Sequence, residues 1–426
     1  MAEASVAAPD SGAASGEDFI PYDPIEQFQD AAGDVRDPYP DLAESRRTHP
    51  VYLVDWYEAM GLPADAEVPD GPPMYTVFSH QYVHQVLSDN ETFSSSGYAE
   101  IMGQLMGHTI LEMDAPEHPR HRALVAKAFR TRMLERWSDA LLKSTVDELI
   151  DQVRPDGKAD LVRALTFPFP VRVIARILGL PEGDWAKFQR WSIELISVGV
   201  NWDRAFSASS ALKEYFTGIV AQKREEPGDD LISQLVCAEV DGHVLTDEEI
   251  FAFLRLLLPA GAETTYRSSG NLLYGLLTHP DQLDAVRNDR SLIPQAIEEG
   301  LRWEPPLLFI MRTCKQDTKL GDVEVPAGSN IGVAIGAANR DPDRYPDPDT
   351  FNIFRDPRQH IAFGAGPHIC LGQHLARLET RIALESVFDK LPNLRLDPDA
   401  MASDDPHIHG MTFRSPTSLP VLFDPS

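Results

Sequence analysis

The chain has 426 residues and a formal net charge of −28, from 66 acidic residues against 38 lysines and arginines. Such an acidic chain is a poor candidate for binding nucleic acid or an anionic membrane surface. Its content of hydrophobic residues, 43%, is enough for one large core or for two to three domains. The three cysteines are too few and too scattered for a disulfide framework, which predicts a reducing compartment.

The N-terminal segment is expected to be disordered. Residues 1–18 are acidic and rich in alanine, serine and glycine, a composition that cannot build a core. They lack the basic and apolar regions of a signal peptide. The chain has no run of 18 or more uncharged apolar residues, so we expect no transmembrane segment.

Short elements are predicted after this tail: a helix at 42–47, a strand at 74–79 and a helix at 81–87. Segment 93–111 is irregular and mixes glycine and serine with apolar residues such as Ile101 and Met106. Methionine adapts to many shapes. The segment therefore fits either the wall of a pocket or a loop that packs its own apolar side chains.

A basic helix is predicted next, beginning at Pro119. Residues 120–136 contain six lysines or arginines and one acid, which is unusual in so acidic a chain. Taken alone, this segment is typical of a solvated helix face. Residues 139–224 then have the pattern of successive amphipathic helices.

The longest predicted helix runs from Thr246 to about Thr278. Thr246 and Glu249 have the spacing of a capping box, which marks a helix N-terminus. Pro259 and Gly261 weaken the centre of this helix, because proline removes a backbone hydrogen bond and glycine is a poor helix former.

An acid and an alcohol, Glu263 and Thr264, follow this weak point directly. One interpretation is a functional bulge in the helix beside the two polar groups. The other is a kinked core helix in which Glu263 is paired elsewhere. The pattern alone does not choose between them.

A shorter helix at 291–303 carries Glu299 and Arg302 on one face. Such pairs are common, and an exposed one contributes only about 0.3–0.5 kcal/mol. The apolar residues 307–311 are predicted to form a strand along a cavity, and Arg312 follows them. Further strands are expected at 318–325 and 330–334, and a final hairpin at 407–423.

The stretch 360–375 reads HIAFGAGPHICLGQHL. Its glycines predict a tight turn or a close approach of the backbone, and the apolar repeat that follows predicts a helix. Cys370 would lie at the N-terminus of that helix, where unpaired N–H groups favour a thiolate over a thiol.

A thiolate held in this way suits a soft metal or a haem iron. A buried structural cysteine is the ordinary alternative. A zinc site is also conceivable, although its spacing fits no common structural zinc pattern. Its ligands would be His360, His368, Cys370 and His374.

The pattern Phe363-Gly364-x-Gly366-x-His368-x-Cys370-x-Gly372 resembles the haem-binding loop of the cytochrome P450 family. Ala260-Gly261-Ala262-Glu263-Thr264 resembles that family's oxygen-activation motif, with Glu where many members have Asp. The likeness covers about residues 35–425. It implies one domain over 19–426, mainly α with a minor β-rich part. A haem b would be buried between the long central helix and the cysteine-loop helix.

The resemblance also implies roles for single residues. Cys370 would be the axial iron ligand, and Glu263 and Thr264 would deliver protons for oxygen activation. Glu299 and Arg302 would form a buried ion pair with a third member, Arg355, or else Arg340 or Arg358. The residues expected at the cofactor are His118, Arg122, Ala260, Gly261, Arg312, Phe363, His368, Cys370 and Gly372.

The implied reaction inserts one oxygen atom of O₂ into a C–H or C=C bond of a hydrophobic molecule. Electrons would come from a separate ferredoxin and its reductase, docked on the remaining charges of 120–136. Residues 191–206 would form a mobile lid, and we expect a cytoplasmic monomer. The candidate substrate residues are Ile101, Met106, Leu257, Leu307 and Phe309.

Two alternatives to this function remain open. The same fold could run peroxide-driven or non-oxygenating haem chemistry, although the acid–alcohol pair argues against that. The chain could instead be a non-catalytic helical protein that binds zinc or another ligand.

Overall fold

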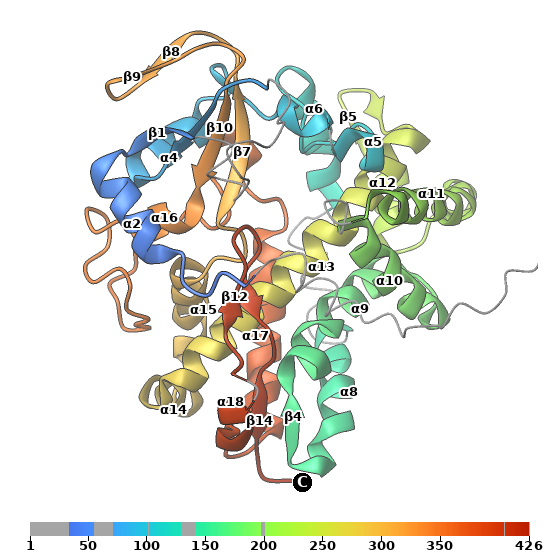
Figure 1. The fold of residues 1–426 in the computed structure, drawn as a ribbon. Coiled ribbons are helices and arrows are strands. Elements are labelled where there is room, and N and C mark those ends of the chain that lie inside the picture. Colours follow the sequence, from blue (N-terminus) through green and yellow to red (C-terminus); the bar gives the residue numbers. More distant parts are fainter. Residues whose placement is uncertain are drawn as a thin grey trace, which may run out of the picture.

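The computed structural model describes residues 34–54, 71–100, 102–128, 141–196, 201–403 and 405–425. These residues form a mainly helical structure with small sheets, as predicted (Figure 1). Four predictions fall partly or wholly outside them: the tail at 1–18, the candidate residue Ile101, part of the basic segment 120–136 and part of the lid at 191–206.

The helices occupy most of the described chain. Their bounds are α2 (Tyr39–Thr48), α4 (His80–Ser88), α5 (Met102–Met106), α6 (Glu117–Ala128), α8 (Lys143–Val153), α9 (Pro168–Ile177), α10 (Trp185–Ile196), α11 (Trp202–Glu225), α12 (Leu231–Val236), α13 (Asp247–Thr278), α14 (Pro280–Asn288), α15 (Ile293–Trp303), α16 (Ile335–Asn339), α17 (Gln373–Lys390) and α18 (Pro398–Ser403). The helices predicted at 42–47, 81–87 and 291–303 correspond to α2, α4 and α15.

The strands form one five-stranded sheet in the order β1-β2-β10-β7-β3, one three-stranded sheet in the order β11-β14-β4, and three hairpins. Their bounds are β1 (Val51–Val54), β2 (Met74–Val77), β3 (Phe93–Ser94), β4 (Lys158–Asp160), β5 (Glu239–Val240), β6 (His243–Val244), β7 (Phe309–Cys314), β8 (Thr318–Leu320), β9 (Val323–Val325), β10 (Asn330–Ala334), β11 (Arg395–Leu396), β12 (Ile408–His409), β13 (Ser415–Pro416) and β14 (Pro420–Leu422). The segment predicted at 318–325 is a hairpin of β8 and β9, because Gly321 adopts a φ of 59° and turns the chain.

Helix α13 is the centre of the fold. It crosses the middle of the molecule and packs against α9, α11, α15 and α17 (Figure 1). The predicted capping box is formed at its start: the Thr246 hydroxyl accepts a hydrogen bond from the N–H of Glu249, and the Glu249 carboxylate accepts one from the N–H of Thr246. This helix anchors the main apolar core, and a second core lies against the five-stranded sheet.

The bulge that one of the two interpretations placed near Pro259 is not formed, because α13 is α-helical from Asp247 to Thr278. Pro259 lacks only its own N–H, and its side chain and that of Leu258 are buried. Packing of this face therefore compensates for the missing backbone hydrogen bond.

Replacing Thr246 by Ala should lower the free energy of unfolding by about 1 kcal/mol, because an N-terminal hydrogen bond of α13 is lost. Urea denaturation followed by circular dichroism measures the change. Thr217→Ala is the matched control, since Thr217 is exposed within α11 and its hydroxyl donates only to a carbonyl of the preceding turn. Equal losses in the two variants would contradict the capping role.

Candidate functional site

Cys370 lies in a tight loop directly before α17, as the glycine pattern predicted. Its N–H donates to the carbonyl of Phe363 over 2.8 Å, which closes the loop. Gly364 and Gly366 adopt φ angles of 73° and 69°, a region that favours glycine. A Cβ atom on Gly366 would lie 2.4 Å from the carbonyl oxygen of Leu87. Only glycine fits this position, so α4 fixes the loop from outside.

The pKa of the Cys370 thiol is shifted in the direction opposite to the prediction. Burial raises the pKa of its thiol, although the N–H groups of Gly372 and Gln373 and the charges of Arg122 and Arg377 act in the opposite direction. The helix N-terminus alone therefore does not favour the thiolate, because burial outweighs it. The side chain is nevertheless accessible, so a bound cation could reach the sulfur and stabilise its charged form.

Four of the predicted cofactor residues converge from three segments. His118 and Arg122 lie on α6, Arg312 lies on β7 and His368 precedes Cys370. The rings of His118 and His368 stack with their centroids 4.0 Å apart, and the Arg122 guanidinium donates to the carbonyl of Ile369. We call His118, Arg122, Arg312 and His368 the cationic cluster, after its two arginines.

The cationic cluster lacks a counter-ion in direct contact among the described residues. Arg312 is 7% exposed, and its guanidinium donates to the carbonyl of Met311 over 2.7 Å. The Nε2 atom of His118 is buried and has no hydrogen-bond partner within the described part of the chain. Burial, followed by the neighbouring His118 and Arg312, lowers the pKa of His368 to about 3. The cluster therefore has the character of a binding site for an anionic group.

The centre of α13 presents the acid and the alcohol. Ala260 is exposed, and the Thr264 hydroxyl donates to its carbonyl over 2.7 Å. Glu263 is buried and accepts hydrogen bonds from Arg267 at 3.1 and 3.2 Å. Burial raises the pKa of Glu263 to about 7, while the charge of Arg267 opposes this rise.

Arg267 was missed by the sequence analysis. Its four-residue spacing from Glu263 on one helix was the available signal. The guanidinium also donates to the Ser415 hydroxyl over 2.9 Å, so the C-terminal hairpin reaches this part of α13. The acid is thus paired, as in the second interpretation, and it remains directly next to Thr264.

The ion pair predicted on α15 is buried. Arg302 donates to both carboxylate oxygens of Glu299 over 2.7 and 2.8 Å. Arg355 is the third member, with its Nε atom 3.5 Å from Glu299. The two alternatives have other partners: Arg340 pairs with Glu304, and Arg358 donates to the carbonyl of Arg344.

The candidate substrate residues lie on different elements. Met106 is buried and Leu257 is partly buried, both in the main core, whereas Phe309 packs against a separate small cluster that includes Tyr39. Leu307 pairs with Phe413 of the C-terminal hairpin, and Ile101 lies outside the described residues.

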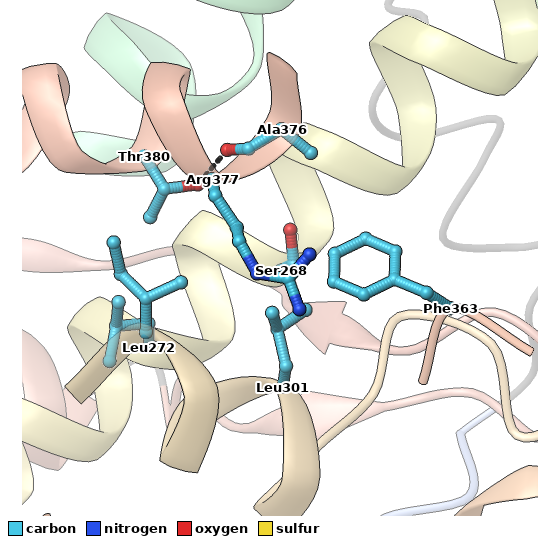
Figure 2. A pocket seen from close by; sticks show the side chains of 8 residues that line it. Ser268, Leu272, Leu301, Phe363, Ala376, Arg377 and Thr380 are labelled. Atoms are coloured by element: carbon cyan, nitrogen blue, oxygen red, sulfur yellow. Dashed lines mark hydrogen bonds between the residues drawn. The ribbon is translucent and has the colours of Figure 1, made fainter. Parts of the chain in front are cut away.

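A small pocket lies beside the cysteine loop, where α13, α15 and α17 meet. Figure 2 shows the Phe363 ring facing into it opposite the Arg377 side chain. The side chains that line it are Ser268, Leu272, Ile297, Leu301, Phe363, Ala376, Arg377 and Thr380.

The alternative of a zinc site finds no support in the described residues. They contain no group of three or more His, Cys, Asp or Glu side chains placed to hold a metal ion. His360 is engaged with Glu298 at 3.1 Å, and His368 stacks on His118.

The sequence model of the family described as Cytochrome P450 matches residues 183–398. Cytochrome P450 107B1 of Saccharopolyspora erythraea is 42% identical over 292 residues, which is 68% of this chain and 72% of that protein. The monooxygenase PikC of Streptomyces venezuelae is 36% identical and covers 85% of each chain. The structure of CYP109E1 from Bacillus megaterium with testosterone superposes with a TM-score of 0.81, at 32% identity, over 91% of this chain and 99% of that chain.

The chain therefore belongs to the cytochrome P450 family. The family's members are haem enzymes, and relatives of this chain are named as hydroxylases and monooxygenases. The cofactor is haem b, iron protoporphyrin IX. The residues present fit this group, because its two propionates supply the anions that the cationic cluster lacks. Within the described chain, every helix is too short or too polar to cross a membrane.

Replacing Glu299 by Ala should lower the free energy of unfolding by about 3–5 kcal/mol, because it leaves the Arg302 charge buried without its partner. Urea denaturation of the haem-loaded protein measures the loss. The control is Glu385→Ala, which removes an exposed partner of Arg381 and should cost less than about 1 kcal/mol. Similar losses in both variants would show that the buried pair does not hold this region.

Proposed function

We propose that Cys370 is the axial ligand of the haem iron in a monooxygenase that hydroxylates or epoxidises a hydrophobic small molecule. The proposal is supported by two features that lie together at the N-terminus of α17. An accessible sulfur lies before α17, and the cationic cluster with its unpartnered His118 nitrogen lies beside it. A thiolate ligand and two carboxylates are the groups by which a haem b is held in this way.

The cationic cluster would hold the propionates of a bound haem. His118 would donate from its Nε2 atom, and Arg122 and Arg312 would supply charged donors from α6 and β7. His368, whose pKa of about 3 keeps it neutral, would position the His118 ring by stacking. Ala260 and Gly261 of α13, with Phe363 and Gly372 of the cysteine loop, would contact the cofactor.

The bound haem supplies the chemistry of O₂ reduction and oxygen-atom insertion. The protein's task is to deliver protons, and Thr264 and Glu263 do this. The Thr264 Oγ1 proton is held by the carbonyl of Ala260 and lies on the exposed side of α13. Glu263, with a pKa of about 7, exchanges a proton at its carboxylate near neutral pH.

Electrons come from a ferredoxin and its reductase. The proposed docking surface includes Arg120 and Lys127 of α6, on the helix that also carries His118 and Arg122. A positive patch on a chain of net charge −28 directs an acidic partner to this face. The enzyme is proposed to act as a monomer in the cytoplasm.

The substrate class is proposed from the pocket candidates and the relatives. Met106, Leu257, Leu307 and Phe309 are apolar, as is Ile101. Relatives include a 6-deoxyerythronolide B hydroxylase of Saccharopolyspora erythraea and a steroid C26-monooxygenase of Mycolicibacterium smegmatis. These names support a large hydrophobic molecule such as a macrolide or a steroid.

The ligand assignment is tested by the spectrum of the reduced, carbon monoxide-bound protein. Wild-type protein should show the strongly red-shifted Soret band of a thiolate-ligated haem, and Cys370→Ser should lose it. Cys237→Ser is the control, because Cys237 is exposed and lies outside the cysteine loop. Retention of the band in Cys370→Ser would reject Cys370 as the ligand.

The proton-delivery assignment is tested by Thr264→Ala, which removes the hydroxyl but keeps the haem environment. The fraction of NADH electrons recovered in product should fall about tenfold or more, while the carbon monoxide spectrum is unchanged. The substrate is found beforehand by screening hydrophobic compounds for a low- to high-spin shift. Thr264→Ser keeps the hydroxyl and should remain coupled. Intact coupling in Thr264→Ala would exclude this role.

A further inference from the structure

Arg377 lies on the first turns of α17 and faces the cysteine loop. The carbon atom at the centre of its guanidinium is 4.3 Å from the centroid of the Phe363 ring, a distance at which a cation and an aromatic face attract each other. Figure 2 shows the two side chains beside the same small pocket. The guanidinium also donates to the Gln373 side chain over 3.2 Å, which ties it to the start of the helix.

The other edge of the Arg377 guanidinium is held by α15. Its Nε and Nη2 atoms donate to the two carboxylate oxygens of Glu298 over 2.6 and 2.9 Å. Such a fork-to-fork pair fixes the plane of the guanidinium as well as its position. Burial alone would raise the pKa of Glu298, but the hydrogen bonds from Arg377 and His360 lower it to about 2. Glu298 is therefore an anion at neutral pH.

His360 completes this network from the loop itself. Its Nε2 atom lies 3.1 Å from Glu298, and its Nδ1 atom accepts a hydrogen bond from the N–H of Ala362 over 3.1 Å. A neutral ring with the proton on Nε2 satisfies both contacts. The network of Arg377, Glu298 and His360 thus joins α17, α15 and the cysteine loop around Phe363.

The charge of Arg377 lies against the loop that holds Cys370. Its guanidinium stacks on the Phe363 ring, and the carbonyl of Phe363 accepts the hydrogen bond from the Cys370 N–H over 2.8 Å. The Arg377 and Glu298 side chains are 31% and 43% exposed, so solvent and salt screen the charge of Arg377 only in part. A positive charge here stabilises an iron–thiolate centre more strongly after it has gained an electron.

We propose that Arg377 is a positioning residue that raises the reduction potential of the bound haem. It stacks on Phe363 and places a positive charge against the cysteine loop, and Glu298 and His360 hold it there. This inference rests on the proposed role of Cys370 as the iron ligand. A residue of α17, outside the loop motif, thereby influences how readily the bound haem accepts an electron.

The test is a spectroelectrochemical titration of the haem-loaded protein with mediator dyes. Arg377→Gln should lower the ferric–ferrous potential, and Arg377→Lys should lower it less, because lysine keeps the charge but loses the planar stacking and the fork-to-fork pair. Arg381→Gln is the control. It removes the same charge one turn further along α17, where Arg381 pairs with Glu385 at 3.0 Å, and it should leave the potential unchanged.

Equal potentials for Arg377→Gln and Arg381→Gln would overturn the proposal. If Arg377→Gln does not retain haem, Arg377→Met decides, because it also removes the charge: a potential below that of the wild type supports the proposal, and an unchanged one rejects it. The carbon monoxide spectrum of the wild type is recorded on the same preparation. A missing red-shifted band would count against Cys370 as the ligand, independently of Arg377.

Discussion

The position of the cysteine loop depends on the buried ion pair between Glu299 and Arg302. Arg302 donates to the carbonyls of Asn339, Pro348 and Thr350, and Glu299 accepts a hydrogen bond from the N–H of Asn352. Asn339 ends α16, and the other three bonds end on the backbone of the irregular segment that precedes the loop. A segment with so little regular structure has few other ways to satisfy its carbonyl and N–H groups. The ion pair therefore fixes the backbone conformation of this part of the chain.

Adjacent carboxylates of α15 serve two different segments. Glu299 faces the irregular segment before the loop, whereas Glu298 faces α17 through Arg377. Consecutive residues on a helix point in directions about 100° apart. One turn of α15 therefore contacts both the segment before the cysteine loop and the helix α17 after it. The buried pair contributes mainly to stability. The half-exposed pair of Glu298 and Arg377 adds little to the free energy of folding, as is usual for exposed ion pairs. Its role is better explained as holding a charge in position.

Features encoded by local sequence were predicted well. The capping box of α13 and the glycine turns around Cys370 follow from spacing within short segments, whereas Arg355 as the third member of the ion pair came from the family resemblance. The failures concern burial, which a single sequence does not reveal. Pro259 is accommodated by packing, and the pKa of Cys370 is set by desolvation more than by its helix terminus. The partner of Glu263 was missed because a buried arginine has the same spacing pattern as an exposed one.

The electrostatics of the cationic cluster link haem binding to the stability of the fold. Burying Arg312, and leaving a nitrogen of His118 without a partner, costs free energy in the protein without cofactor. The cost arises on α6, on β7 and in the loop before α17, three segments that otherwise share few contacts. Propionates bound between them, as proposed, would remove the cost from all three together. Since a ligand that binds only the native state stabilises it by mass action, haem bound as proposed would also stabilise the fold by satisfying these buried groups.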